Sequence, residues 1–312
     1  MPVGLRAACG YNSAMTTKSK PADLPAEASQ AADNPPVQAE TAPAHGAFAP
    51  GLPARIGLSI GRRLPQGRVG LRAAGAVRPL ALIGLREGQS DVEALGLRLR
   101  LHPQDNLSEK RLFLTPQCFD PVELDALRAF MAPGKVFFDI GANAGAYALV
   151  AAKAGGPSAR VIAVEPQREM RRRLLFNARQ NDLHNIECSG AALSDFEGED
   201  VLRMVAGNRG GAALTGHSGQ AAGEAVRVTT LAKLAEEMRI DRIDAMKIDV
   251  EGGELPILAP YLKATAPDLW PSLLILERAD MGGRDAPDAA AFAMSKGYGV
   301  SARTRMNVVL TR

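Results

Sequence analysis

The stretch Val136-Phe137-Phe138-Asp139-Ile140-Gly141-Ala142-Asn143-Ala144-Gly145-Ala146-Tyr147 decides the fold of this chain. A short apolar run ends near an acid, and a loop with two glycines four positions apart leads into an alanine-rich segment. This order predicts a buried parallel strand, a tight turn and the start of a helix. In open α/β sheets a ligand lies beyond the carboxyl ends of the strands, where a helix start offers unpaired N–H groups. We therefore expect a ligand site at this turn.

The glycine spacing distinguishes between classes of nucleotide ligand. A dinucleotide fingerprint, Gly-x-Gly-x-x-Gly, needs glycine where this chain has Asn143 and Ala146. An NAD-dependent oxidoreductase is therefore a disfavoured alternative. The Gly-x-x-x-x-Gly-Lys-Ser/Thr phosphate loop does not occur in the chain either.

A second acid extends the pattern. Glu165 follows Gly145 by twenty residues and ends the next apolar run, 160–164, where it can accept both hydroxyls of a ribose. Asp139 or Asn143 is placed to bind an amino group. A ligand with a ribose and an amino group but no pyrophosphate indicates S-adenosylmethionine.

Composition narrows the class of protein. The 312 residues suffice for one large domain or two small ones, and a net charge of +3 is too small to predict a nucleic-acid partner. Three cysteines without a Cys-x-x-Cys pair indicate neither a disulfide framework nor a thiolate zinc site. No apolar stretch approaches the ~20 residues of a membrane span, and Met1–Gly10 lacks the apolar core of a signal peptide. We expect a cytoplasmic protein without a membrane span.

We expect three regions along the chain. Residues 1–55, rich in Ala and Pro, predict a disordered tail. Residues 56–118 predict a mobile basic connector and then a small β-meander with strands at Leu97–Leu101 and Arg111–Leu114. Contact of the connector with anionic lipid or an acidic glycan is the less favoured alternative. Residues 119–312 predict the main domain.

Strands and helices alternate through the main domain, which is typical of a parallel sheet. Asp120-Pro121 predicts the start of one helix, and Pro166–Asp182 predicts another. Asn185–Cys188 predicts the third strand, and two runs near the end of the chain predict a terminal antiparallel pair. The second helix carries five arginines that we interpret as a solvated outer face: Arg168, Arg171, Arg172, Arg173 and Arg179.

Two later stretches carry candidate chemistry. Residues 198–224 are glycine-rich and polar, which predicts a lid or substrate loop containing His217. In Ile243–Gly253 side chains two positions apart share a face, so Lys247, Asp249 and Glu251 lie together on a buried strand. Burying these groups is costly unless they meet a ligand or each other. A structural ion pair between Lys247 and a carboxylate is the alternative.

As an ordered set, these motifs resemble the FkbM family of S-adenosylmethionine-dependent methyltransferases over roughly residues 97–312. The resemblance implies a Rossmann-like, seven-stranded, mostly parallel sheet with helices on both faces. It also implies methyl transfer to a hydroxyl of a sugar, glycan or polyketide-type small molecule. The family often has Asp after Thr-Thr-Leu, where this chain has Ala232. The matching residues are Phe138–Gly145, Glu165-Pro166, Asn177, Ala192–Asp195, Val228–Leu231 and Ile243–Gly252.

These observations assign roles to individual residues. Gly141 and Gly145 let the methionine end of the cofactor approach the backbone. Ser194 and Asp195 follow the third strand and are placed to flank the adenine.

An alcohol acceptor also needs a proton acceptor within hydrogen-bond reach. Asp249 is the first candidate for that role, followed by Glu251 and His217. We predict no metal site and no nucleic-acid partner. A non-catalytic module that binds S-adenosylmethionine remains a further alternative.

Overall fold

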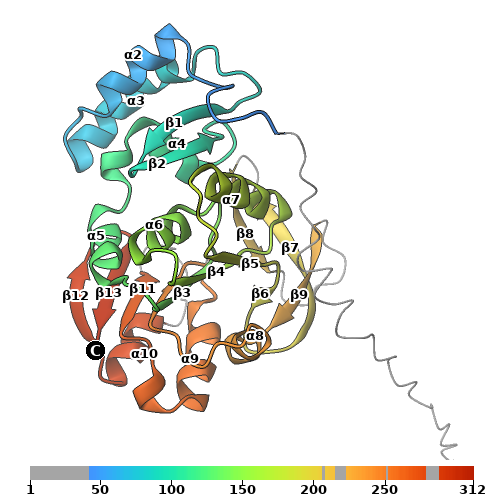
Figure 1. Ribbon diagram of the computed structural model, residues 1–312. Helices are drawn as coiled ribbons and strands as arrows, with labels where there is room; N and C mark the ends of the chain where they lie inside the picture. Colours follow the sequence, from blue (N-terminus) through green and yellow to red (C-terminus); the bar gives the residue numbers. More distant parts are fainter. Residues whose placement is uncertain (1–41, 206–207, 215–222, 251, 279–287) are drawn as a thin grey trace, which may run out of the picture.

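The computed structural model describes residues 42–205, 208–214, 223–250, 252–278 and 288–312 (Figure 1). Most of the expected disordered tail, residues 1–41, lies outside this part of the chain, as do His217 and Glu251.

A seven-stranded sheet forms the centre of the protein, in the order β12-β13-β11-β10-β3-β4-β5. Five strands are parallel, and β12 and β13 pair antiparallel at one edge. This arrangement confirms the predicted Rossmann-like sheet. The chain builds β3, β4 and β5 on one side and returns to place β10 and β11 on the other, so strand order reverses between β3 and β10. The strands are β3 (Val136–Ile140), β4 (Arg160–Val164), β5 (Ile186–Ser189), β10 (Ala245–Ile248), β11 (Leu273–Glu277), β12 (Gly299–Arg303) and β13 (Asn307–Thr311).

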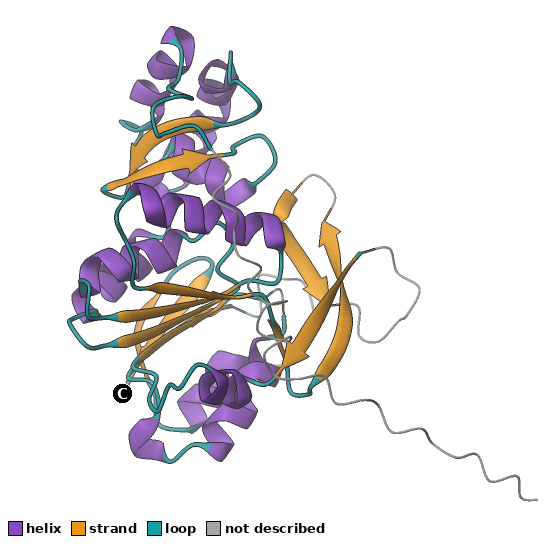
Figure 2. Ribbon diagram, turned by 45° about the vertical axis from the view of Figure 1, so that its right-hand side comes forward, coloured by secondary structure: helices purple, strands orange, loops and turns teal. Residues whose placement is uncertain are grey.

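Helices cover both faces of this sheet (Figure 2). Side chains alternate between the faces along each strand, so Phe137 joins one apolar layer and Phe138 the other. The first layer packs on α5, α6 and α7, and the second packs on α8, α9 and α10. The helices are α5 (Pro121–Phe130), α6 (Ala146–Gly155), α7 (Arg168–Gln180), α8 (Leu231–Glu237), α9 (Glu254–Ala264) and α10 (Ala289–Ser295).

A second sheet stands beside the carboxyl edge of the first, in the order β6-β9-β7-β8. Much of residues 198–224 therefore forms an antiparallel strand pair, and the expectation of a long loop there is wrong. Its glycines and polar residues hide the strand alternation in the sequence. The strands are β6 (Ala192–Leu193), β7 (Gly198–Val205), β8 (Asn208–Leu214) and β9 (Glu224–Thr229).

The expected basic connector is helical. Residues 52–82 form α2 (Leu52–Gly61) and α3 (Arg68–Leu82), which pack against each other. A Cβ on Gly57 would lie 2.6 Å from the backbone nitrogen of Ala81, so this glycine permits close helix packing. Some of the glycines that indicate flexibility in the sequence therefore lie where the two helices pack against each other.

Only half of the expected β-meander is present. Strands β1 (Ser90–Ala94) and β2 (Leu97–Leu101) form an antiparallel hairpin, but the expected strand Arg111–Leu114 lies in helix α4 (Leu107–Leu114). The Asn106 side chain caps this helix by accepting a hydrogen bond from the Glu109 backbone N–H at 3.0 Å. A four-residue apolar run alone does not distinguish strand from helix.

Residues 42–118 pack firmly on the sheet domain. One buried apolar cluster extends from Leu58 through α4 and α6 to Val309. The Asn177 amide of α7 accepts from the Arg100 N–H at 2.7 Å and donates to the Arg100 carbonyl at 3.2 Å, as a neighbouring strand would. Phe48 of the expected tail is buried and lies under the Arg100 guanidinium, 4.6 Å from it.

The arginines of α7 are not all solvated. Arg173 is buried and pairs with Glu109 at 2.6 Å, Asp105 at 2.8 Å and Glu169 at 2.9 Å. Arg171 donates to the carbonyls of Glu165 and Pro166. The expectation of a solvated outer face is wrong for these two, because α4 and the 165–167 turn pack beside α7.

Candidate active site

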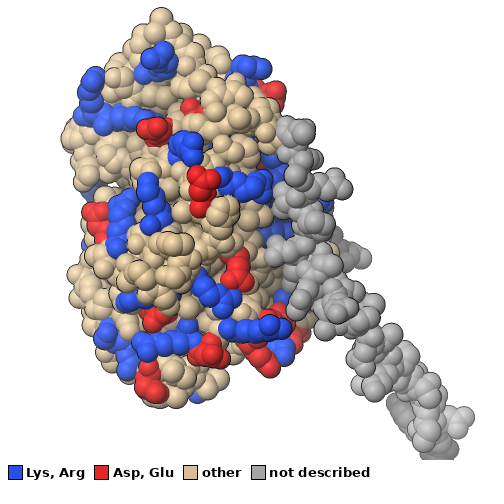
Figure 3. All heavy atoms as spheres, in the orientation of Figure 1, with Lys and Arg blue, Asp and Glu red and all other residues tan. Residues whose placement is uncertain are grey.

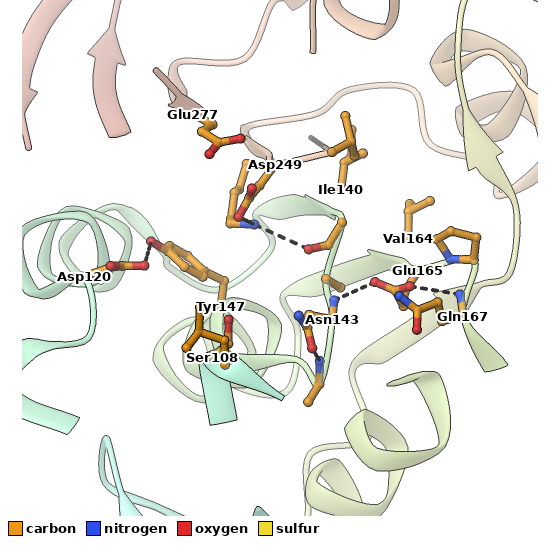
Figure 4. Close-up of a pocket in the computed structure, with 18 of the residues that line it drawn as sticks. Ser108, Asp120, Ile140, Asn143, Tyr147, Val164, Glu165, Gln167, Asp249 and Glu277 are labelled. Atoms are coloured by element: carbon orange, nitrogen blue, oxygen red, sulfur yellow. Dashed lines mark hydrogen bonds and ion pairs between the residues drawn. The ribbon is translucent and has the colours of Figure 1, made fainter. Parts of the chain in front are cut away.

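A cavity of about 510 Å³ opens where the strand order reverses. Its wall comes from the carboxyl ends of β3, β4, β10 and β11, together with β6 and residues of α4 (Figure 4). Open α/β sheets bind ligands at this position, and the volume suits a nucleoside-sized ligand.

Glu165 directly follows β4 and contributes a buried carboxylate to the cavity. Its Oε2 accepts from the Asn143 N–H at 2.8 Å and its Oε1 accepts from the Gln167 N–H at 2.9 Å. Burial raises the pKa of Glu165 to about 7, although these two hydrogen bonds oppose the shift. Each oxygen retains a second lone pair for a hydroxyl donor.

The loop after β3 is shaped by packing. Gly141 has φ +74°, and a Cβ there would lie 2.0 Å from the Asp249 carbonyl oxygen. Gly145 has φ +89°, and a Cβ there would lie 2.4 Å from the Leu174 side chain. Close contact with β10 and α7 therefore accounts for both glycines, whereas the sequence reasoning attributed them to approach of the cofactor. Asn143, at φ 52°, also lies in the left-handed region.

Lys247 lies between two carboxylates. Its buried Nζ is 3.1 Å from Asp249 Oδ2 and 3.7 Å from Asp139 Oδ1, and it sits 5.0 Å from the Tyr147 ring centre. Burial alone would lower the pKa of Lys247, but the two carboxylates outweigh it and the pKa is raised. The structural ion pair between Lys247 and a carboxylate, which the sequence left open as an alternative, is present. It still leaves the Asp249 side chain partly exposed.

The two acids differ in environment. Asp139 is 1% exposed, and its Oδ2 accepts from the Ala148 N–H at 2.9 Å, which caps α6 where Gly145 has no side chain to do so. Burial raises the pKa of Asp139, against the effect of Lys247. The side chain of Asp249 is 44% exposed and lines the cavity.

A polar group lies at the far end of the cavity from Glu165 (Figure 4). The Tyr147 hydroxyl donates to Asp120 Oδ2 at 3.1 Å, and Arg111 pairs with Asp120 Oδ1 at 3.1 Å. Burial raises the pKa of Asp120 and holds that of Tyr147 well above its ordinary value. Glu277, at the end of β11, lines the same end.

The structure brings five of the sequence-predicted site residues together around the cavity: Gly141, Asn143, Glu165, Ser194 and Asp249. Asp139 and Gly145 lie behind its wall, and Asp195 is exposed to solvent beside Ser194. Among the described residues no group of three or more His, Cys, Asp or Glu side chains is arranged to hold a metal ion.

The sequence reasoning missed Gln167, Arg111 and Asp120 as cavity residues. Gln167 is buried, and its Oε1 has no hydrogen-bond partner among the described residues. Its position two residues after Glu165, in the turn that follows a strand, is the signal that points to it. Asp120 is signalled only as a helix start.

Comparison with known proteins identifies the chemistry. Residues 139–292 match the family described as methyltransferase FkbM domain. These residues form an FkbM methyltransferase domain. S-adenosylmethionine is its cofactor, and the site suits it. The unpartnered Gln167 Oε1 and the free lone pairs of Glu165 accept from amino and hydroxyl groups, and the cavity wall carries more acids than bases.

No curated protein matches this chain. Solved structures resemble it only distantly. An rRNA methylase from Streptococcus thermophilus is 12% identical, with a TM-score of 0.37, over 61% of this chain and 94% of that chain. A precorrin-6y C5,15-methyltransferase from Geobacter metallireducens is 14% identical, with a TM-score of 0.37, over 61% and 84%. Trm5b from Pyrococcus abyssi is 13% identical, with a TM-score of 0.40, over 73% and 56%.

None of the described helices has the length and apolar composition that crossing a membrane requires.

Proposed function

We propose that this enzyme transfers a methyl group to a hydroxyl of a small, hydroxyl-rich acceptor such as a sugar, a glycan or a polyketide-type molecule. The observation that carries the proposal is Asp249, a cavity-facing carboxylate held in place by the buried Lys247. A hydroxyl is a weak nucleophile until a group takes its proton, and a carboxylate beside the acceptor can do so.

On the cofactor side, we assign the ribose to Glu165, whose two oxygens are fixed by the Asn143 and Gln167 N–H groups. Gln167 Oε1 and Ser194 offer acceptors for the adenine end. S-adenosylmethionine supplies, when bound, a methyl group on a positively charged sulfur. The protein then has to align the acceptor oxygen with that group and exclude water.

On the acceptor side, Asp249 would accept the proton of the hydroxyl while the oxygen bonds to the methyl carbon; the bond between that carbon and the sulfur would break, and S-adenosylhomocysteine would be the leaving group. Lys247 holds the Asp249 carboxylate at 3.1 Å. The Asp120 carboxylate and the Tyr147 hydroxyl provide further hydrogen-bonding groups for a polyol at the same end of the cavity.

The charge of the cavity wall favours a neutral polyol over a phosphate-rich acceptor. Arg111 and Lys247 are its basic side chains in the described part of the chain, and both contact carboxylates. A nucleic-acid backbone would find, in the described part of the wall, no basic side chain that is not already paired with a carboxylate. The acids of the wall are Glu109, Asp120, Glu165, Asp249 and Glu277.

The test is transfer of a tritiated methyl group from S-adenosylmethionine to fractionated polar extracts, with mass spectrometry of the labelled product. We expect an O-methyl ether. Asp249→Asn should lower kcat about 10²- to 10⁴-fold while S-adenosylhomocysteine binding stays within a few-fold of wild type. Asp268→Asn, which changes an exposed carboxylate far from the cavity, is the matched control.

Three results would redirect the proposal. A labelled methyl group on a nitrogen or carbon atom of the product would exclude O-methyl transfer. Wild-type kcat in Asp249→Asn across the pH range would remove that residue as the proton acceptor. Cofactor binding without label transfer to any fraction would favour the non-catalytic module.

A further inference from the structure

The helical pair α2–α3 has an unusual composition. Residues 52–83 contain six arginines and no Asp, Glu or Lys. In the described part of the chain none of the six forms an ion pair with a carboxylate. Within the described residues this region therefore carries positive charge that no carboxylate pairs with at ion-pair distance, although Arg62 is partly buried and lies within electrostatic reach of Glu93. The arginines are Arg55, Arg62, Arg63, Arg68, Arg72 and Arg78.

Helix α2 also exposes large aliphatic side chains. Leu52, Ile56 and Ile60, spaced four residues apart, are 68%, 47% and 44% exposed. At this spacing they form one stripe along the helix. The stripe lies opposite the buried face formed by Ala54, Gly57, Leu58 and Gly61.

Helix α3 repeats this combination. Its buried positions are Gly70, Ala74 and Ala81, while Val69 is 73% exposed and Leu71 is 39% exposed. Ile83, just after the helix, is 52% exposed. Six of the ten large apolar side chains that are exposed in the described residues therefore lie in residues 52–83.

The pair sits at one end of the molecule, farthest from α9 and α10 (Figure 1). In the same orientation the space-filling view shows blue side chains among tan surface at this end (Figure 3). No helix of the described chain covers the outward side of the pair in either ribbon view.

We propose that the α2–α3 surface docks on a bilayer that contains anionic lipid. Arginines near an anionic leaflet are attracted to its headgroups, and exposed Leu, Ile and Val side chains gain by leaving water for the acyl region. A nucleic acid would use the arginines but would leave the aliphatic side chains in water. The joint presence of both kinds of side chain, without any acid, therefore favours lipid.

The proposal is tested with the full chain by flotation with vesicles. We compare phosphatidylcholine alone with phosphatidylcholine containing about one-third phosphatidylglycerol. Binding is expected only to the second composition. It should weaken when salt rises from ~0.1 M to ~1 M, because the Debye length falls from about 10 Å to 3 Å.

Two double variants separate the contributions. Arg63→Gln/Arg72→Gln should weaken partitioning about 25-fold, taking about fivefold for each arginine. Ile56→Asp/Ile60→Asp should weaken it by more than about tenfold. The matched controls lie elsewhere on the surface and should bind as wild type: Arg128→Gln/Arg303→Gln and Val122→Asp/Val300→Asp. Circular dichroism and Tm establish that each variant is folded.

Failure to float with anionic vesicles overturns the proposal, as does equal loss of binding in the control variants. Equal binding to both vesicle compositions overturns the role of the arginines. Tighter binding to a single-stranded RNA oligomer than to vesicles, with Ile56→Asp/Ile60→Asp unaffected, identifies a nucleic-acid surface instead. Self-association that these same isoleucine changes abolish identifies a second copy of the chain.

Discussion

Glu165 makes cofactor binding depend on pH. Burial raises the pKa of this carboxyl from its ordinary 4.5 to about 7. The ribose hydroxyls that we assign to it are hydrogen-bond donors, so the ionised carboxylate is the form that accepts from both. Cofactor binding should therefore strengthen as pH rises through 7.

The magnitude follows from the fraction of ionised Glu165. With a pKa of about 7, roughly one-eleventh of the molecules carry the carboxylate at pH 6 and roughly ten-elevenths carry it at pH 8. If only the ionised form binds, Kd for S-adenosylhomocysteine falls about tenfold between these pH values. The stability of the unliganded protein should follow the opposite trend. Since the folded state holds this proton more tightly than the unfolded chain, its stability falls by about 3 kcal/mol as pH rises from 4.5 to above 7.

Isothermal titration calorimetry with S-adenosylhomocysteine at pH 6, 7 and 8, in buffers of different ionisation enthalpy, measures both affinity and proton release. Wild type should release close to one proton at pH 6 and almost none at pH 8. Glu165→Gln, which cannot ionise, should bind more weakly at pH 8 and show no such slope. Equal affinity at pH 6 and 8, or the same slope in Glu165→Gln, would refute the reasoning.

Three further predictions concern stability and are read from chemical denaturation. Gly141→Ala should lower the free energy of unfolding by about 3 kcal/mol or more, because the new Cβ meets the Asp249 carbonyl at positive φ. Gly75→Ala, in α3 with open space around it, should raise the free energy of unfolding by about 0.5–1 kcal/mol. A similar loss at both sites would contradict the packing argument. Arg173→Leu should cost about 3–5 kcal/mol by leaving Glu109 buried without its cation, whereas Arg172→Leu, at the surface, should cost no more than about 1 kcal/mol. Asn177→Ala should lower the free energy of unfolding by about 2 kcal/mol, because it leaves the backbone N–H and carbonyl of Arg100 unpaired. Asn181→Ala, whose hydrogen bonds to Arg98 are exposed, should lower it clearly less. Equal losses would show that burial of these hydrogen bonds does not matter.

The sheet was predictable from the sequence because its central strands are mostly apolar, with an acid within or just after each of β3, β4, β10 and β11. Those strands are buried on both faces, so no competing arrangement satisfies them. The loop acids Glu165 and Asp249 follow from the same logic, since parallel strands bring their carboxyl ends to one edge.

The N-terminal region was harder because its signals are local and ambiguous. Gly57 and Gly61 indicate flexibility in the sequence, yet they allow α2 to pack closely on Ala81 and Leu114. Arg173 resembles its exposed neighbours in sequence, and only the packing of α4 on α7 shows that it pairs with Glu109. Asp120 enters the cavity through tertiary contacts with Arg111 and Tyr147, which spacing along the chain does not encode.

The neighbouring acids Asp139 and Asp249 show how environment separates structural from chemical roles. Both contact Lys247. Asp139 is buried, and one of its oxygens accepts a hydrogen bond from the N-terminus of α6, which makes it a positioning group for the loop after β3. Asp249 shares the same lysine but faces the cavity, where it can exchange a proton with an acceptor. Since one cation contacts both carboxylates, removing it should affect them differently: Lys247→Met should leave Asp139 to be protonated in its buried site, while Asp249 keeps its contact with water but loses the group that holds it in place. We expect the variant to fold, to lose kcat through a misplaced Asp249, and to regain stability as the pH falls. Stability that declines in parallel with wild type on acidification would show that Asp139 does not depend on this lysine.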